Sequence, residues 1–238
     1  MATVATLDNR VEIKLAIYQL TGFSGEDGAL SEHETNTGDA LNRIVYQAMR
    51  DAQSWYLSQV NPNYWKKQSS TLSFTDVQST EGRFYVALPS DFLRMYGDQE
   101  NSALRRPNGR RWGQLVDPDQ RSIRGSNLYW LEHDELSVAR GATIPTDLVM
   151  DYTYLIPELT ADGTAVDFPQ DDRILIPAFA AVDIADMPMF PGDAELRQRI
   201  GSYLKRKQRE IYVRGRRTKE PRKVKHNPTV GNRWFIRS

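Results

Sequence analysis

The sequence contains no cysteine and only three histidines among its 238 residues. The lack of thiols excludes disulfide bonds and zinc sites that depend on cysteine ligands. No stretch approaches the ~18 consecutive apolar residues of a membrane-spanning helix, and the N-terminus lacks the apolar run of a signal peptide. We therefore expect a soluble protein that is made in a cytoplasm and has no membrane partner.

Recognisable catalytic motifs are also missing. The chain has no Gly-x-Ser-x-Gly motif, no Walker loop and no Gly-x-Gly-x-x-Gly motif. His33, His133 and His226 lie in three different segments, and none has the spacing of a metal ligand. Acidic pairs such as Asp171 and Asp172 fit a helix start better than a pair of catalytic carboxylates. We expect no enzymatic activity, no metal site and no cofactor.

Charge is abundant but unevenly distributed. The 31 basic and 31 acidic residues cancel, yet 15 of the basic residues and only two of the acidic ones fall within residues 196–238. That segment carries a net charge of +13, and residues 1–195 carry −13. Such asymmetry is typical of a terminal segment with its own acidic partner. On charge alone, nucleic acid, a membrane surface or an acidic protein would fit, and the last includes another copy of this chain. Of these three, we do not expect the membrane.

Apolar periodicity predicts helices in both halves of the chain. Asp8 and Asp193 are the expected N-caps of the first and last helix, Gly22 ends the first one, and the polar residues 22–36 form a loop. The expected helices cover residues 8–21, 39–58, 170–188 and 193–213.

Between these helices, residues 68–157 change to short segments with near-alternating apolar residues. Turn signals such as Pro107-Asn108-Gly109 separate the segments, and the acidic residues around His133 form a hairpin turn. This pattern predicts an antiparallel β unit. A short helical turn is expected at Asp91-Phe92-Leu93, after Pro89.

The predicted fold class is α+β: a four-helix bundle with an inserted antiparallel β domain and an extended basic C-terminal arm. The arm cannot bury a core of its own, so we expect it to be extended or disordered until it binds a partner. The expected boundaries are 1–67 for the N-terminal helices, 68–157 for the β domain, 158–213 for the C-terminal helices and 214–238 for the arm.

Two sets of residues are candidates for binding a partner. In the arm, an apolar triplet follows the basic residues and is either a docking anchor or a frayed terminus. In the β domain, four arginines flank a Pro-Asn-Gly turn, which is either a contact loop for a tail protein or neighbouring subunit or a solvated hairpin. The arm candidates are Arg214, Arg216, Arg217, Lys219, Arg222, Lys223, Lys225, Trp234, Phe235 and Ile236, and the loop candidates are Arg105, Arg106, Arg110 and Arg111.

Four segments, in this order, resemble the head–tail adaptor (connector) proteins of tailed bacteriophages over residues 8–213. The first is a strand that runs into an L-P-x-D-F-L turn, and the last opens a helix after Asp-Phe-Pro. The segments are Val86–Arg94, Leu128–Glu132, Val149–Tyr154 and Asp167–Ala181.

The resemblance implies a structural protein without enzymatic activity. It implies a homo-oligomeric ring of twelve subunits in the neck of the virion, between the portal protein and a downstream tail or nozzle protein. It also implies that the C-terminal arm docks on the portal and that the ring lines the conduit through which genomic DNA passes without sequence specificity. An acidic body fits a conduit, because a strongly basic lumen would hold the phosphates.

The alternative is a nucleic-acid-binding module with a basic tail. The two hypotheses differ in the partner of the +13 segment, which is phosphate in one case and protein in the other.

Overall fold

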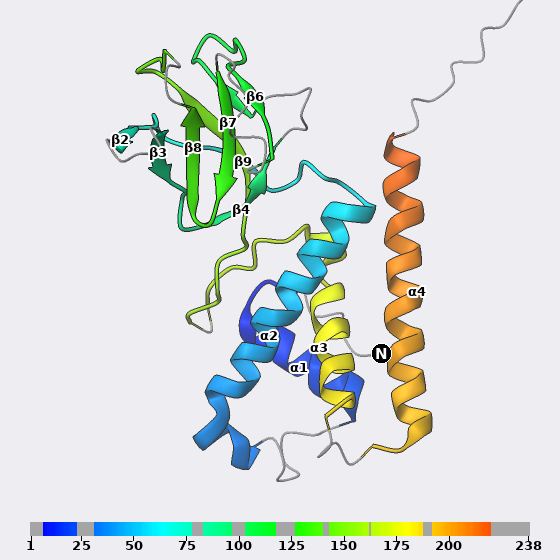
Figure 1. The fold of residues 1–238 in the computed structure, drawn as a ribbon. Coiled ribbons are helices and arrows are strands. Elements are labelled where there is room, and N and C mark those ends of the chain that lie inside the picture. The colour runs from blue at the N-terminus through cyan, green and yellow to red at the C-terminus, as the bar shows by residue number, and fades with distance from the viewer. Residues whose placement is uncertain are drawn as a thin grey trace, which may run out of the picture.

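The computed structural model of the chain shows a helical unit and a β unit that is inserted between the second and third helices (Figure 1). It describes residues 7–22, 31–77, 83–96, 103–117, 127–139, 143–161, 163–187 and 192–219. The helices are α1 (Arg10–Thr21), α2 (Ser31–Gln59), α3 (Leu175–Ala185) and α4 (Ala194–Lys219), and a 3-10 turn, η2, covers Gln170–Asp172. The predicted α+β class is confirmed.

The β unit consists of short strands in two sheets. The strands are β1 (Lys66–Gln68), β2 (Thr75–Val77), β3 (Arg83–Ala87), β4 (Phe92–Met95), β5 (Leu104–Arg105), β6 (Gln114–Leu115), β7 (Leu128–Glu132), β8 (Glu135–Ala139) and β9 (Val149–Tyr154). One sheet has the order β1-β9-β4, with β5 also paired to β9, and the other has the order β2-β3-β8-β7-β6. The prediction of a wholly antiparallel unit is wrong for one pair, because β6 runs parallel to β7.

Two local predictions for the β unit have opposite outcomes. The acidic hairpin turn is confirmed, because β7 and β8 pair antiparallel with Glu132 opposite Glu135. The helical turn expected at Asp91 is wrong, since Phe92 already begins β4. The tight turn lies one step earlier, where the Phe92 N–H donates to the Pro89 carbonyl at 2.9 Å.

Helix α3 is the centre of the helical unit. It is apolar on nearly all sides and packs against α1, α2 and α4, as expected for a helix without a solvent-facing stripe. Its buried residues include Leu175, Ile176 and Ile184. Three helices therefore surround a fourth, and a regular four-helix bundle is not confirmed.

The start of α1 differs from the prediction by one residue. Asn9, not Asp8, is the N-cap, and its side chain accepts a hydrogen bond from the Glu12 N–H at 3.1 Å. The Asp8 carboxylate instead forms an ion pair with Arg173, just after η2. Gly22 ends α1 in the left-handed conformation, as predicted, with φ of 80°.

Three other helices have boundaries that differ from the prediction. The helix expected over 170–188 is limited to α3, which begins at Leu175 after the 3-10 turn η2 and ends at Ala185. Helix α2 begins at Ser31, so the last part of the loop expected over 22–36 is helical. Helix α4 continues to Lys219, so the extended arm expected from Arg214 does not begin there. The cap of α4 is as predicted: the Leu196 N–H donates to Asp193 Oδ1 at 2.7 Å.

Each unit has its own hydrophobic core, and one residue joins the two. The helical core is built mainly from α2 and α3, whereas the main β core surrounds Tyr129, Leu136 and Met150. Tyr154, the last residue of β9, packs against both cores. The central strand of one sheet therefore leads directly into the helical unit.

Candidate interaction surfaces

Arg214 contacts the body of the protein and does not belong to a free arm. Its guanidinium forms an ion pair with Asp172, whose side chain is 8% exposed. The next residue, Gly215, lies against Val60 so closely that a Cβ atom would be 2.7 Å from Cγ1 of Val60. These two contacts fix the end of α4 to the body. The sequence prediction missed them because nothing in a basic segment distinguishes the residue that has an intramolecular partner.

The other predicted arm residues divide into two groups. Arg216, Arg217 and Lys219 belong to the last turn of α4. Arg222, Lys223, Lys225, Trp234, Phe235 and Ile236 lie outside the described residues. Any arm that binds a partner therefore follows a helix that is anchored at Arg214.

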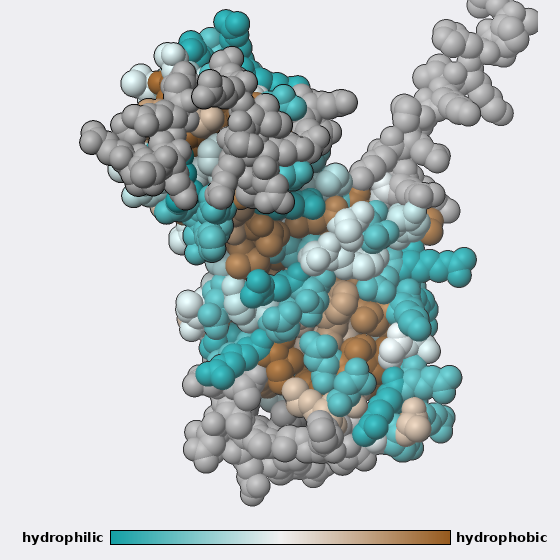
Figure 2. Space-filling view, viewed as in Figure 1, coloured by the Kyte–Doolittle hydropathy of each residue, from teal (hydrophilic) through white to brown (hydrophobic). Residues whose placement is uncertain are grey.

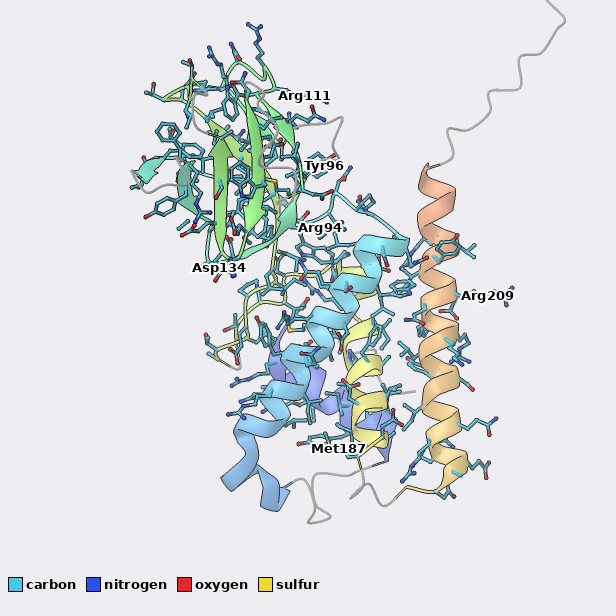
Figure 3. All side chains as sticks on the ribbon, in the orientation of Figure 1. Arg94, Tyr96, Arg111, Asp134, Met187 and Arg209 are labelled. Carbon is cyan, nitrogen blue, oxygen red and sulfur yellow. The ribbon has the colours of Figure 1, made fainter. Side chains whose placement is uncertain are left out.

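Helix α4 has a buried apolar face and an exposed basic face. Ile200, Leu204 and Ile211 are buried against the helical core. Figure 3 shows Arg209 on the side of α4 that points away from the other helices, and Figure 2 shows hydrophilic residues along this outer side. The exposed basic residues of α4 are Arg197, Arg199, Lys205, Arg206, Arg209 and Arg214.

The single acidic residue among these basic ones, Glu210, is neutralised locally. Lys207 Nζ lies 2.9 Å from its carboxylate, and Arg206 lies 3.9 Å from it. The hydrogen bond from Lys207 holds the pKa of Glu210 below its ordinary value. The outer face of α4 therefore remains positive.

The arginine-flanked turn in the β unit has the predicted shape. The Arg106 N–H donates to the Arg110 carbonyl at 2.9 Å, and Gly109 has φ of 79°. Arg106, Arg110 and Arg111 are exposed, and Figure 3 places Arg111 at the end of the β unit remote from the helices. Arg105 differs from them, because its guanidinium lies 2.5 Å from the buried Asp151 carboxylate. Three of the four predicted arginines are therefore on the surface, whereas Arg105 forms an ion pair between β5 and β9.

A hydrogen-bonded junction between the two units was not predicted. The buried Gln53 of α2 donates to the Tyr154 carbonyl at 2.8 Å and accepts from the Ile156 N–H at 3.3 Å. The Trp65 indole donates to the Asp167 carbonyl at 3.1 Å, and the Tyr154 hydroxyl donates to Asp167 Oδ2 at 2.7 Å. Burial, followed by this last hydrogen bond, raises the pKa of the Tyr154 hydroxyl.

The L-P-x-D-F turn supplies the second half of the junction. Asp91 accepts hydrogen bonds from Lys67 at 2.7 Å and from the Tyr152 hydroxyl at 2.8 Å, and its carbonyl accepts from the Leu155 N–H at 2.7 Å. Burial opposes ionisation of Asp91, but the hydrogen bonds from Lys67 and Tyr152 outweigh it and lower the pKa of the carboxyl. The turn over residues 89–92 joins β3 of one sheet to β4 of the other. It is also hydrogen-bonded to the chain that follows β9.

A pocket of about 580 Å³ opens beside this junction. A second pocket of about 560 Å³ adjoins it and shares Lys67, Ser90 and Asp91. The first pocket is lined by Tyr46, Lys67, Ser90, Asp91, Tyr154, Leu155, Ile156, Pro157 and Asp167.

No protein-family model matches this sequence, and no curated protein is similar to it. The likeness to head–tail adaptors therefore depends on the four sequence segments named above.

Neither metal coordination nor membrane crossing is supported by the described residues. Within the described ranges, no three His, Cys, Asp or Glu side chains converge in a way that could hold a metal ion. In the same part of the chain, no helix is both long and apolar enough to cross a bilayer.

Proposed function

We propose that this chain is a structural adaptor of the head–tail interface in a tailed bacteriophage. In this role it forms a ring, of twelve subunits by analogy with the adaptors that it resembles, between the portal and a downstream tail or nozzle protein. It would be located in the neck of the virion and would line the path of the genomic DNA. The proposed activity is assembly, without catalysis.

The observation that carries the proposal is the separation of charge by helix α4. This helix buries an apolar face that includes Ile200 and Leu204, exposes basic residues such as Arg206 and Arg209, and is followed by a further basic segment, residues 220–238. An acidic body and a basic terminal segment on one chain are complementary in a head-to-tail contact between copies. A head-to-tail contact that closes on itself gives a ring.

The anchor at Arg214 supports a docking role for the residues that follow. A terminal segment that binds a partner needs a fixed starting point, because each freely rotating residue adds to the entropy lost on binding. The ion pair with Asp172 and the contact of Gly215 with Val60 hold the end of α4 in place. The segment that would dock on the portal is therefore residues 220–238, shorter than the sequence indicated.

The test is deletion of residues 220–238, which leaves both anchoring contacts in place. The truncated protein should keep its thermal unfolding transition, since the described core and both anchoring contacts remain, but should no longer bind purified portal rings. Binding is measured by co-sedimentation and by negative-stain electron microscopy. Normal portal attachment by the truncated protein would contradict the proposal.

Two further variants separate the two features of the segment. Replacement of Arg222, Lys223 and Lys225 by Gln tests the charge, and Trp234→Ala tests the apolar end. If the terminal triplet is a docking anchor, Trp234→Ala should cost at least about 2 kcal/mol of binding, as expected for an aromatic hot spot.

The exposed basic row on α4 favours a second candidate, a nucleic-acid-binding module. In that case the isolated protein binds DNA, and the logarithm of its affinity falls linearly with the logarithm of the salt concentration. Replacing Arg199, Arg206 and Arg209 by Gln should reduce that slope by about one for each phosphate that is no longer neutralised. Absence of DNA binding at low salt would remove this candidate.

A further inference from the structure

The junction pocket combines the groups that recognise a basic side chain. Tyr154 and Tyr46, whose ring already has the Arg50 guanidinium 5.8 Å from its centre, supply aromatic rings. Leu155 and Pro157 supply apolar surface, and Asp167 supplies a carboxylate. An arginine or lysine side chain has the matching features, which are an aliphatic stem and a cationic head. Cations are attracted to the faces of aromatic rings and form strong hydrogen bonds with carboxylates.

Asp167 has capacity for one more donor. Its Oδ2 accepts the Tyr154 hydroxyl at 2.7 Å, whereas its Oδ1 accepts no hydrogen bond from the residues that the structure describes. Asp167 is only partly buried and lines the pocket. A guanidinium that entered the pocket could therefore bind Oδ1 without breaking the hydrogen bond that holds Tyr154.

Lys67 already shows how the pocket treats a cation. Its ammonium lies 2.7 Å from the Asp91 carboxylate and 5.8 Å from the centre of the Tyr154 ring. Lys67 satisfies Asp91, so Asp167 is the carboxylate that is left for an incoming cation. With one lysine and two aspartates, the ionisable lining has a net charge of −1.

The second pocket shares Lys67, Ser90 and Asp91 with the first, and the two together form a trough beside the junction. It runs along the chain between β1 and β2 and along the Leu88–Ser90 segment, and it is rich in hydroxyl groups and backbone. An extended peptide could place one basic side chain in the first pocket and continue along the second. The lining residues that carry hydroxyl groups there include Ser69, Ser70, Thr71, Ser73 and Ser90.

Residues 220–238 of this chain have the chemistry of such a peptide. They contain five basic residues and one acidic residue, and fully extended they span roughly 60 Å. Figure 1 shows α4 on one side of α2 and the segment that follows β9 on the other. The charge of this segment is complementary to the net negative lining of the pocket.

We infer that the junction pocket binds a basic side chain from residues 220–238 of a neighbouring copy. This inference rests on the proposed ring. It assigns one basic side chain of the segment to the neighbouring subunit and leaves the rest of the segment for the portal. The binding site comprises Tyr46, Tyr154 and Asp167, with the trough beside Lys67 and Asp91 guiding the peptide backbone.

Photo-crosslinking of the full-length protein, without portal or DNA, tests this contact. Tyr46 is replaced by benzoylphenylalanine, and equal amounts of ¹⁴N- and ¹⁵N-labelled protein are mixed before irradiation. Mass spectrometry then identifies the attached peptide and shows whether the two partners come from different copies. We expect cross-links to residues 220–238, with mixed isotope labels.

Two matched variants examine the role of the carboxylate. Asp167→Asn keeps an oxygen that can accept the Tyr154 hydroxyl but removes the charge, and it should reduce the cross-link yield about tenfold. Glu158→Gln removes an exposed charge that does not line the pocket and should leave the yield unchanged. An equal loss in both variants would contradict a specific site and indicate attraction by overall charge alone.

The outcomes also separate this inference from the proposed function. Cross-links within one copy, cross-links to other segments, or none at all would overturn the inference, whereas portal binding that requires residues 220–238 would still support the adaptor role. Intermolecular cross-links in a protein that fails to bind any portal would support the pocket and contradict the adaptor role.

Discussion

Gly215 in α4 lies directly against Val60, the residue that follows α2, with no room between them for a Cβ atom. The contact joins elements that are more than 150 residues apart in the sequence. It lies beside the ion pair between Arg214 and Asp172. The end of the last helix is therefore fixed by one steric and one electrostatic contact, and each can be tested separately.

Gly215→Ala should destabilise the protein despite the better helix propensity of alanine. The added Cβ would lie 2.7 Å from Cγ1 of Val60, and overpacking of this kind costs about 1–3 kcal/mol, more than the ~1 kcal/mol that alanine contributes within a helix. The melting temperature should fall.

The control is to make the same change in a Val60→Ala protein, which lacks the Cγ1 atom that the added Cβ would contact. On that background, Gly215→Ala should become neutral or stabilising by up to about 1 kcal/mol. The same loss on both backgrounds would show that the close contact is not the cause.

Arg214→Gln should destabilise the protein by about 1–3 kcal/mol, because it leaves the nearly buried Asp172 carboxylate without its cation. Denaturant unfolding measures the loss. Arg209→Gln, on the exposed face of the same helix, serves as the control and should change stability little. The double variant Arg214→Gln, Asp172→Asn should recover part of the lost stability. If the effects of the two changes simply add, the ion pair between Arg214 and Asp172 does not stabilise the protein.

Gln53→Ala should weaken the attachment of the β unit to the helices. It removes the donor to the Tyr154 carbonyl and the acceptor for the Ile156 N–H, and a buried group left without its partner costs about 1–3 kcal/mol. Hydrogen exchange should become faster at Ile156. The exposed Gln59→Ala at the end of the same helix is the control, and equal effects of the two would contradict the role assigned to Gln53.

Asp183→Asn should stabilise the protein at neutral pH. Burial, followed by repulsion from Asp51 and Asp186, raises the pKa of the Asp183 carboxyl above its ordinary value of 3.8. The folded state therefore keeps this proton longer than the unfolded state as the pH rises, and stability falls through that range until the folded pKa is passed.

The gain from Asp183→Asn should be present at pH 7 and should disappear below about pH 3.8, where the carboxyl is protonated in both states. Thermal unfolding across this pH range measures it. A gain that is independent of pH would mean that packing, and not ionisation, limits stability at this position.

The sequence predicted features that depend on local chemistry. The N-cap of Asp193, the left-handed Gly22 and the Pro-Asn-Gly turn all depend on residues within a few positions of each other, and all are present. The amphipathic face of α4 was predicted for the same reason, since its apolar residues recur with the helical period.

The features that the sequence did not predict depend on distant partners. Nothing near Gln53 indicates that its amide bonds the backbone after β9, about 100 residues later. Arg105 and Arg106 are adjacent in sequence, but only the first has the buried Asp151 as a partner. The candidate pocket was missed because its residues come from α2, β1, the turn before β4 and the chain after β9.

The central position of α3 has a consequence for the order of folding. Helices α1 and α2 leave the ribosome before the whole β unit is made, and α3 follows α2 by more than 100 residues. At about 5–20 residues per second, the apolar faces of α1 and α2 wait for at least about 5 s before the helix that covers them has been synthesised. The β unit, whose strands all precede α3, is complete before the helical core can close.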